Sequence, residues 1–221
     1  MAFYFSKPAD FVFKAGQYVQ LSLVEPPETD DDGDIRTLSI ASAPFEKELL
    51  FAMRMRDKAF KRVLKNMTPG SSVKIDGPFG NLVLHDDISR PAVFLVGGIG
   101  ITPVFSILKQ SHHENKSHRI FLFYSNPAPK DAAFLDELKA LDQDWEQFRL
   151  VATMTRPEKS DSWQGERGKI SGTLLKKYLD DFSKPVFYVV GSLDMVLNMT
   201  GMLRGLGVEE NLLKYEEFIG Y

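Results

Sequence analysis

A glycine-rich turn, Gly97–Gly100, follows the apolar run Ala92–Val96 and precedes Thr102 and Pro103. Threonine pairs an otherwise free N–H at a helix start, and proline is favoured at the first helical position. A helix is therefore expected here with Thr102 as its N-cap. Glycines let a phosphate or ribose approach the backbone, and the helix start attracts the anion. The spacing is not the G-x-G-x-x-G fingerprint, so a tight turn without a ligand stays open as the alternative.

A second turn of this kind follows the apolar run Val186–Val190. Gly191 and Ser192 lead into a helix expected over Met195–Leu206. Taken alone, this turn is better explained as a capped helix. Two such turns at one edge of a sheet, however, can hold the two ends of one dinucleotide.

Short strand-like runs separated by turn residues are typical of the first 88 residues. Apolar and polar residues alternate over Tyr18–Val24, which indicates a half-buried strand. The expected strands are Ala2–Ser6, Tyr18–Val24, Arg36–Ala41, Leu49–Arg54, Ser72–Asp76 and Leu82–Leu84, with a helix over Ala59–Asn66. Many short strands punctuated by proline and glycine predict a small antiparallel β-barrel.

Strands and helices alternate in the second half of the chain. The expected strands are Ala92–Val96, Ile120–Tyr124, Phe148–Thr153 and Val186–Val190, and the expected helices are Pro103–Gln110, Phe134–Gln143, Thr173–Leu179 and Met195–Leu206. This alternation predicts a parallel sheet with right-handed crossovers. We therefore expect two domains, an antiparallel β-barrel over residues 1–88 and an α/β parallel-sheet domain over residues 89–221.

The composition excludes several classes of protein. The 221 residues include 27 Lys and Arg against 30 Asp and Glu, a net charge of −3 that does not suit nucleic-acid binding. The apolar runs are too short for a membrane span, and a cytoplasmic protein is expected. With no cysteine there is no disulfide or Cys-ligated cluster within the chain. No metal site is expected, since His112, His113 and His118 have no carboxylate at ligand spacing, and the acidic segment Asp30–Asp34 is interpreted as a solvated hairpin loop.

Arg36 and Ser39 are the residues of the first half whose types suit ligand binding. The guanidinium of Arg36 matches a phosphate bidentately, although an arginine in a barrel strand usually points to solvent. The hydroxyl of Ser39 can meet a ring nitrogen. Gly77–Gly80 is interpreted by itself as a turn.

Taken together and in this order, these segments resemble the ferredoxin–NADP reductase superfamily of flavoenzymes. The segments that carry the resemblance are Gly16–Tyr18, Arg36–Ser39, Gly77–Gly80, Gly97–Pro103, Gly191–Met195 and Glu217–Tyr221. Each motif is weak alone, but their order along essentially the whole chain is specific.

The resemblance implies a flavin-binding barrel, with FAD or alternatively FMN, followed by a domain that binds NADPH or NADH. The implied function is a flavin-dependent NAD(P)H oxidoreductase that passes hydride to FAD and electrons on to an external acceptor. Ferredoxin, flavodoxin, free flavin or a partner subunit are the candidate acceptors. Two alternatives stay open: a free-flavin reductase, and a non-catalytic nucleotide-binding or docking module of a larger electron-transfer complex.

By the same resemblance, Arg36 holds a flavin phosphate and Ser39 lies beside the flavin N5. The residues expected at the reaction centre are Ser39, Glu217 and Phe218. The other residues expected to contact the flavin are Tyr18, Thr37, Leu38, Arg54, Ala59, Phe60, Gly77 and Gly80. The residues expected to bind the nicotinamide nucleotide are Gly97, Gly98, Gly100, Ile101, Thr102, Pro103, Gly191, Asp194 and Met195. Tyr221 is expected to cover a flavin face or to shape the nicotinamide pocket, as is Phe218.

The chain departs from the family pattern in places. Leu38 replaces an aromatic residue that often packs on the flavin, and Val190 stands where many members have cysteine. The barrel is expected to lack its first strand. Arg156 and Lys169 can neutralise a 2′-phosphate, which favours NADPH slightly, although similar arginines occur in enzymes that use NADH.

Overall fold

The structure is a computed structural model that describes residues 1–158 and 162–218. Its first half forms two antiparallel sheets, β1 with β4 and β3-β2-β5. The elements are β1 (Ala2–Ser6), β2 (Tyr18–Leu23), β3 (Ile35–Ser39), β4 (Glu48–Ala52), α1 (Ala59–Asn66) and β5 (Val73–Phe79). No ladder joins the two sheets within the described residues, so the antiparallel strands are confirmed whereas a closed barrel is not shown.

One hydrophobic core lies between these sheets and α1. The alternation predicted for β2 is confirmed, because Val19, Leu21 and Leu23 are all buried there. They pack with Phe51 of β4 and with Phe60 of α1. The short strands of this half thus share one core, and α1, which lies between β4 and β5 in sequence, packs against it.

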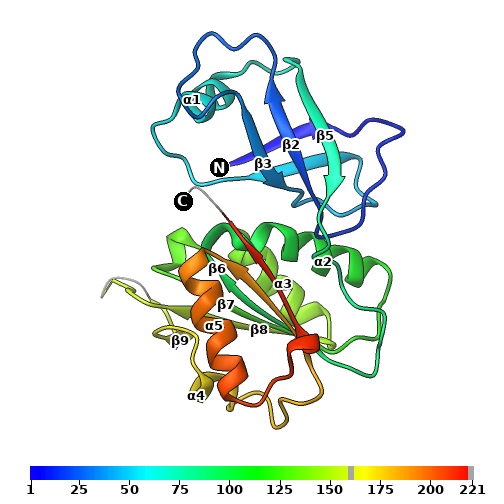
Figure 1. Cartoon of the computed structure of the whole chain (residues 1–221), viewed down its shortest axis with the longest axis vertical. Helices are drawn as coiled ribbons and strands as arrows, with labels where there is room; N and C mark the ends of the chain where they lie inside the picture. Colours follow the sequence, from blue (N-terminus) through cyan, green and yellow to red (C-terminus); the bar gives the residue numbers. More distant parts are fainter. Residues whose placement is uncertain (159–161, 219–221) are drawn as a thin grey trace.

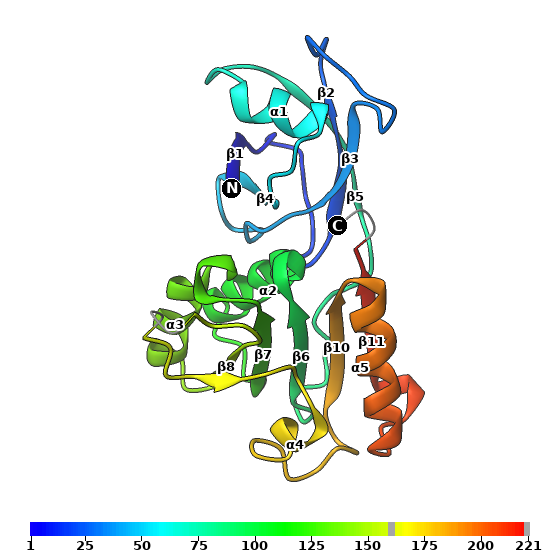
Figure 2. The same ribbon diagram turned by 90° about the vertical axis from the view of Figure 1, so that its left-hand side faces the viewer.

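The second half is a six-stranded parallel sheet in the order β11-β10-β6-β7-β8-β9. Its strands are β6 (Ala92–Gly97), β7 (Ile120–Asn126), β8 (Phe148–Met154), β9 (Glu166–Arg167), β10 (Val186–Gly191) and β11 (Leu213–Glu217). Its α-helices are α2 (Ile101–His113), α3 (Leu135–Asp144), α4 (Gly172–Leu175) and α5 (Leu193–Gly205), with short 3₁₀ turns η1 (Gly98–Gly100), η2 (Pro129–Asp131) and η3 (Glu210–Leu212). In Figures 1 and 2, α5 lies on one face of the sheet and α2 and α3 lie on the other. No helix in the described ranges is long and apolar enough to cross a membrane.

The structure corrects several expected elements. Leu82–Leu84 is irregular rather than a strand, because Leu82 is buried in the core of the second half instead of pairing with a neighbour. β5 continues through the Gly77–Pro78 peptide to Phe79, where an isolated turn was expected. The edge strands β9 and β11 were not predicted, since β9 is two residues long and β11 is rich in charged side chains.

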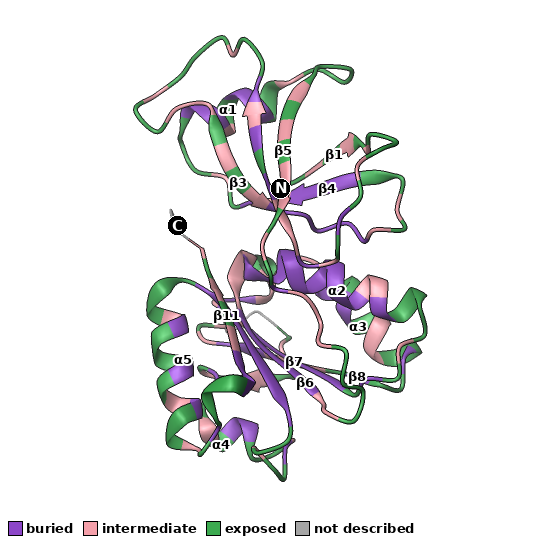
Figure 3. Cartoon of the chain, turned by 45° about the vertical axis from the view of Figure 1, so that its right-hand side comes forward, coloured by how far each residue is buried: buried purple, intermediate pink, exposed green. Residues whose placement is uncertain are grey.

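Helix α2 belongs to the second half of the chain and contacts the first half. It starts at the glycine turn after β6, and most of its residues are buried, as Figure 3 shows. Its Ser106 Oγ donates to the carbonyl oxygen of Ser42 at 2.6 Å, and its Lys109 pairs with Glu46. The glycine turn is therefore fixed relative to the first half by the same helix that it begins.

Gly100 permits the close approach of this turn to β10. A Cβ at Gly100 would lie 2.8 Å from the carbonyl oxygen of Val190. We expect Gly100→Ala to lower the free energy of unfolding by about 1–3 kcal/mol, because backbone would have to shift. Gly201→Ala in α5 is the control: nothing lies within 4 Å of its Cβ position, so alanine should stabilise the helix by about 0.5–1 kcal/mol. Denaturant unfolding measures both, and equal stability of the two variants would contradict this account.

Candidate functional site

A cleft of about 410 Å³ lies between the two halves of the chain. Its walls come from β3, from the segment between β4 and α1, from the glycine turn and from the end of β11. The lining residues are Asp32, Ile35, Arg36, Thr37, Leu38, Ser39, Ala52, Met53, Arg54, Arg56, Lys58, Lys61, Ile99, Thr102 and Phe218. Segments far apart in sequence thus converge, and seven of the residues that the sequence pointed to line the cleft: Arg36, Thr37, Leu38, Ser39, Arg54, Thr102 and Phe218.

The glycine turns lie side by side at the point where the sheet order reverses. Val96 of β6 pairs with Val190 of β10, and the crossovers that follow leave in opposite directions. Ligands of open parallel sheets bind outside the carboxyl ends of the strands at such a point. This register places Gly97 and Gly191 at the same edge of the sheet, as expected.

The first turn is built differently from the expected cap. Gly98–Gly100 forms a 3₁₀ turn, and α2 starts at Ile101 with Gly100 as its N-cap. The hydroxyl of Thr102 donates to the carbonyl oxygen of Ile99 at 3.1 Å and does not cap the helix. Ile101, Thr102 and Pro103 are buried in the first turn of α2. The helix start is instead tightened by the 3₁₀ hydrogen bonds, so the glycine turn continues directly into α2.

Met195 fills the space that the two glycines leave. A Cβ at Gly97 would lie 2.3 Å from the Met195 sulfur, and one at Gly191 would lie 2.8 Å from it. Ser192 Oγ accepts from the Met195 N–H at 3.4 Å, so the cap predicted for α5 is confirmed. Asp194 is exposed in the first turn of the same helix. The thioether therefore links the two turns into one wall.

Gly98 has a φ of 55°, a left-handed conformation that favours glycine. Its Cβ position lies 3.0 Å from Arg54 Nη2, so the guanidinium of the first half lies over the turn of the second. Because Gly98 has no side chain, the Arg54 guanidinium can lie this close to the turn.

Arg36 is held at the edge of the cleft by the backbone around it. Its Nη1 donates to the carbonyl oxygens of Asp32, Gly33 and Ile35 at 2.9, 3.0 and 2.7 Å. Its guanidinium carbon lies 4.9 Å from the ring centroid of Phe60. Nη2 is buried and makes no hydrogen bond, although carboxylates lie 3.8 and 3.9 Å away. One nitrogen of a fixed guanidinium thus makes no hydrogen bond and lies between two carboxylates.

The acidic segment lies in the hairpin loop between β2 and β3, as expected, but two of its carboxylates bind the start of α1 instead of facing only solvent. Asp30 Oδ2 accepts from the Ala59 N–H at 2.8 Å, at the first residue of α1. That bond is the main reason why the pKa of Asp30 lies below its ordinary value. Asp32 pairs with Lys58 at 2.9 Å, which raises the pKa of the lysine. The segment thus contacts the start of α1 through one hydrogen bond and one ion pair.

The cleft is basic although the whole chain is not. The basic side chains that line it are Arg36, Arg54, Arg56, Lys58 and Lys61. Burial, with the neighbouring charges of Arg56 and Arg36, lowers the pKa of Lys61. Asp32 is the acidic residue of the lining, so the local potential favours an anion.

Ser39 gives the cleft a buried polar atom. The residue is 5% exposed, and its Oγ has no hydrogen-bond partner. A buried hydroxyl without a partner costs free energy, so it marks a place where a ligand atom would be accommodated. Thr37 and Leu38 of the same strand also line the cleft.

Tyr18, Gly77 and Gly80 lie together outside the cleft lining. The Tyr18 ring is 2.9 Å from the Cβ position of Gly80, and the Tyr18 carbonyl oxygen is 3.2 Å from that of Gly77. Arg156 and Lys169 are exposed and do not line the cleft either. Arg156 follows β8 and donates its N–H to the carbonyl oxygen of Pro127 at 2.8 Å. None of these five residues lines the cleft.

The end of β11 brings Phe218 into the cleft. Glu217 pairs in register with Gly191, and the Phe218 N–H donates to the Gly191 carbonyl oxygen at 2.9 Å. The side chain of Glu217 is exposed. Tyr221 lies outside the described residues.

Glu216 is a residue that sequence reasoning missed. Its Oε2 lies 3.8 Å from the Cβ position of Gly80, so it faces the first half while Glu217 is exposed. Burial raises the pKa of Glu216 to about 7. Successive side chains of a strand point to opposite faces, so these neighbours can be told apart once β11 is recognised as a strand.

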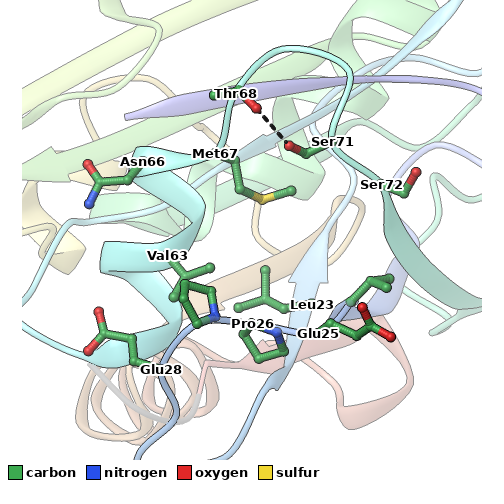
Figure 4. Close-up of a pocket in the computed structure, with 12 residues that line it drawn as sticks. Leu23, Glu25, Pro26, Glu28, Val63, Asn66, Met67, Thr68, Ser71 and Ser72 are labelled. Atoms are coloured by element: carbon green, nitrogen blue, oxygen red, sulfur yellow. Dashed lines mark hydrogen bonds between the residues drawn. The ribbon is translucent and has the colours of Figure 1, made fainter.

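A second hollow, of about 480 Å³, lies against α1 and is shown in Figure 4. Leu23, Val63 and Met67 give it an apolar lining, and Thr68 bonds Ser71 across its rim at 3.2 Å. Among the described residues, none of the buried side-chain atoms without a partner belongs to its lining. The cleft with Arg36 and Ser39 is therefore the stronger candidate.

Glu216 predicts a pH dependence of stability. Because its pKa in the folded chain is about 7 against an ordinary 4.5, the folded state binds the extra proton between these values. Stability should therefore fall as the pH rises through this window, by about 3 kcal/mol at most. Glu216→Gln should remove that decline, whereas the exposed Glu217→Gln should retain it. Thermal melts near pH 5 and near pH 8 measure the difference, and identical pH profiles of Glu216→Gln and the parent would refute it.

Known proteins resemble this chain in sequence and in fold. Residues 94–200 match the family model of the oxidoreductase NAD-binding domain. One subunit of the Na(+)-translocating NADH-quinone reductase of a Marinomonas species is 30% identical over 187 residues, covering 83% of this chain and 44% of that protein. The corresponding subunit of Idiomarina loihiensis is 26% identical over 205 residues, covering 86% and 50%. The chain thus spans about half the length of these curated relatives.

Solved structures share the arrangement of both halves. The flavohem-like FAD/NAD-binding domain of nitric oxide dioxygenase from Vibrio cholerae has a TM-score of 0.82 and 23% identity, covering 98% of this chain and 91% of that one. A ferredoxin NADP+ reductase from Neisseria gonorrhoeae, solved with bound FAD and NADP, has a TM-score of 0.80 and 24% identity with the same coverage. The chain therefore has the ferredoxin–NADP reductase-like fold, and its residues 94–200 are similar to the oxidoreductase NAD-binding domain.

Proposed function

We propose that this chain is an NAD(P)H-dependent flavoprotein reductase, with a flavin in the cleft and a nicotinamide nucleotide at the glycine turns. The observation that carries the proposal is the meeting of Arg36 and the unpartnered Ser39 with the turn at Gly98 in one basic cleft. Residues 1–88 would hold the flavin, and residues 89–221 the nucleotide. The relatives are named as reductase subunits or as FAD- and NAD-binding domains, which supports this interpretation.

The residues present fit a flavin nucleotide. Arg36 Nη2 is a buried donor without a hydrogen bond and suits a phosphate oxygen. Ser39 Oγ is a buried hydroxyl without a partner and suits a ring nitrogen. Phe218 and Leu38 supply apolar surface in the same cleft. We propose FAD, with FMN as the alternative.

A bound flavin would supply the redox chemistry, accepting hydride from the nicotinamide and passing electrons to an acceptor. The side chains of this chain would contribute orientation. Met195 and the two glycine turns form the wall against which the nicotinamide would be placed, and α2 fixes that wall relative to Ser39. Such positioning accounts for a large share of the catalysis in a transfer that needs no side-chain acid.

The nucleotide and the acceptor are the open choices within this function. Arg156 and Lys169 are exposed near the carboxyl ends of β8 and β9, where they are accessible to a 2′-phosphate. The relatives named as NADH-quinone reductase subunits favour NADH instead. We propose that electrons leave to an external acceptor, either a partner protein such as a ferredoxin or flavodoxin, or another domain or subunit.

The protein reconstituted with FAD should be reduced by NAD(P)H. An anaerobic absorbance titration should show the flavin band bleaching after NADH or NADPH is added. The nucleotide that reacts faster identifies the preferred donor, and Arg156→Ala should slow only a reaction with NADPH. Uptake of flavin that neither nucleotide reduces would favour a non-catalytic module, and rapid turnover of loosely bound flavin would favour a free-flavin reductase.

Arg36→Ala should weaken binding of FAD by about tenfold to a hundredfold, since a charge-assisted hydrogen bond is lost. Arg149→Ala is a matched control, because this arginine is exposed and pairs with Asp142 away from the cleft. Equilibrium dialysis with FAD measures both affinities. Equal FAD affinity in Arg36→Ala and the parent would show that another group holds the phosphate.

Gly98→Val should raise the Michaelis constant for the nucleotide, because a side chain there meets Arg54 and closes the turn to a ligand. Gly207→Val is the control for backbone strain: its φ is 86°, and nothing lies within 4 Å of its Cβ position. Steady-state kinetics at saturating FAD separate the two effects. A Michaelis constant that rises equally in both variants would point to general strain.

A further inference from the structure

Asp30 lies against two donors that a phosphate would use, and it forms a hydrogen bond with one of them. Its Oδ2 accepts from the Ala59 N–H at 2.8 Å, and its Oδ1 lies 3.8 Å from Arg36 Nη2. The Ala59 N–H has no partner within the helix, since it lies at the start of α1, a place that attracts anions. A carboxylate of this chain thus lies where a backbone donor and the free nitrogen of a fixed guanidinium converge.

The contact is made across a long stretch of sequence from a partly exposed loop. The side chain of Asp30 is 27% exposed, and that of Asp32 is 50% exposed. The loop is closed locally, since Gly33 N–H donates to the Asp30 carbonyl oxygen at 2.8 Å. The Asp30 side chain can therefore leave Ala59 by rotation while this backbone bond stays in place, at the cost of the hydrogen bond that its Oδ1 accepts from the Asp32 N–H at 3.1 Å.

An independent feature marks the cleft as a ligand site. Ser39 Oγ is buried, lacks a partner and lies in the same lining as Arg36. It does not interact with the acidic loop in any hydrogen bond of the described residues. A ligand that satisfies Ser39 and reaches Arg36 with a phosphate meets the Asp30 carboxylate at the second point.

We propose that Asp30 is an internal competitor for the phosphate of the flavin nucleotide. This inference rests on the proposed function. One N–H donates fully to one acceptor, and two anions in contact repel each other, so phosphate binding requires Asp30 to leave Ala59. Asp30 thereby lowers the affinity for phosphorylated flavins and leaves that for riboflavin unchanged, which makes the flavin readily exchangeable.

The test compares FAD, FMN and riboflavin binding to the parent and to Asp30→Asn by fluorescence titration at fixed ionic strength. Asparagine keeps the shape and can still accept from Ala59, but it carries no charge. We expect roughly tenfold tighter binding of FAD and FMN, as removal of a like charge about 4 Å away would give, with riboflavin unchanged. Asp31→Asn, an exposed neighbour on the same loop, is the matched control and should change none of the affinities.

Unchanged or weaker FAD and FMN binding in Asp30→Asn would overturn the competition while leaving the flavin site intact. Equal tightening for riboflavin would overturn it too, because the effect would then not involve phosphate. Failure of every flavin to bind the parent and both variants would overturn the proposed function together with this inference. Should Asp30→Asn not fold, Asp32→Asn applies the same test through Lys58, with a smaller tightening expected and no tightening counting against the proposal.

Discussion

The burial of helix α2 against both halves of the chain determines the geometry of the cleft. Its first turn continues the glycine turn after β6, and its flank contacts the segment that follows β3 through Ser106 and Lys109. Because buried helices in a close-packed interior shift only at a cost, a displacement of either wall must be transmitted to the other. Ser39 ends β3 and Gly98 lies in the glycine turn. The contacts of α2 consequently hold these two residues at a fixed separation.

Charge is arranged locally around this frame. A chain with a net charge of −3 concentrates arginine and lysine on one cleft and then places acidic side chains over its end. Asp30 and Asp32 reduce the positive electrostatic potential of the cleft, which would otherwise attract any anion. A basic cleft with such an acidic edge has a weaker long-range field but retains its short-range donors, so shape and hydrogen bonding weigh more in the choice of ligand.

The sequence predicted those features that depend on local periodicity. The alternation of β2, the bounds of α1 and the buried runs of β6 and β10 follow from side chains adjacent in sequence, and the order of the motifs indicated which segments converge. The contact of Asp30 with Ala59 joins residues 29 positions apart and leaves no local pattern. Thr102 has the residue type of a cap, but the preceding 3₁₀ turn already satisfies the helix start. The sequence pointed to Glu217 and not to Glu216, because the charged residues of β11 hide its strand pattern. Only that pattern shows that the two side chains lie on opposite faces.

The thioether of Met195 has a consequence for how related sequences can vary. Since its sulfur lies beside both Gly97 and Gly191, a side chain at either glycine requires the flexible thioether to move or position 195 to carry a smaller residue. Changes at these three sites are therefore coupled, because a larger residue at either glycine is accommodated more easily when position 195 is smaller. Co-variation of this triplet among homologues would be a record of steric packing, distinct from any selection for the ligand that the turns bind.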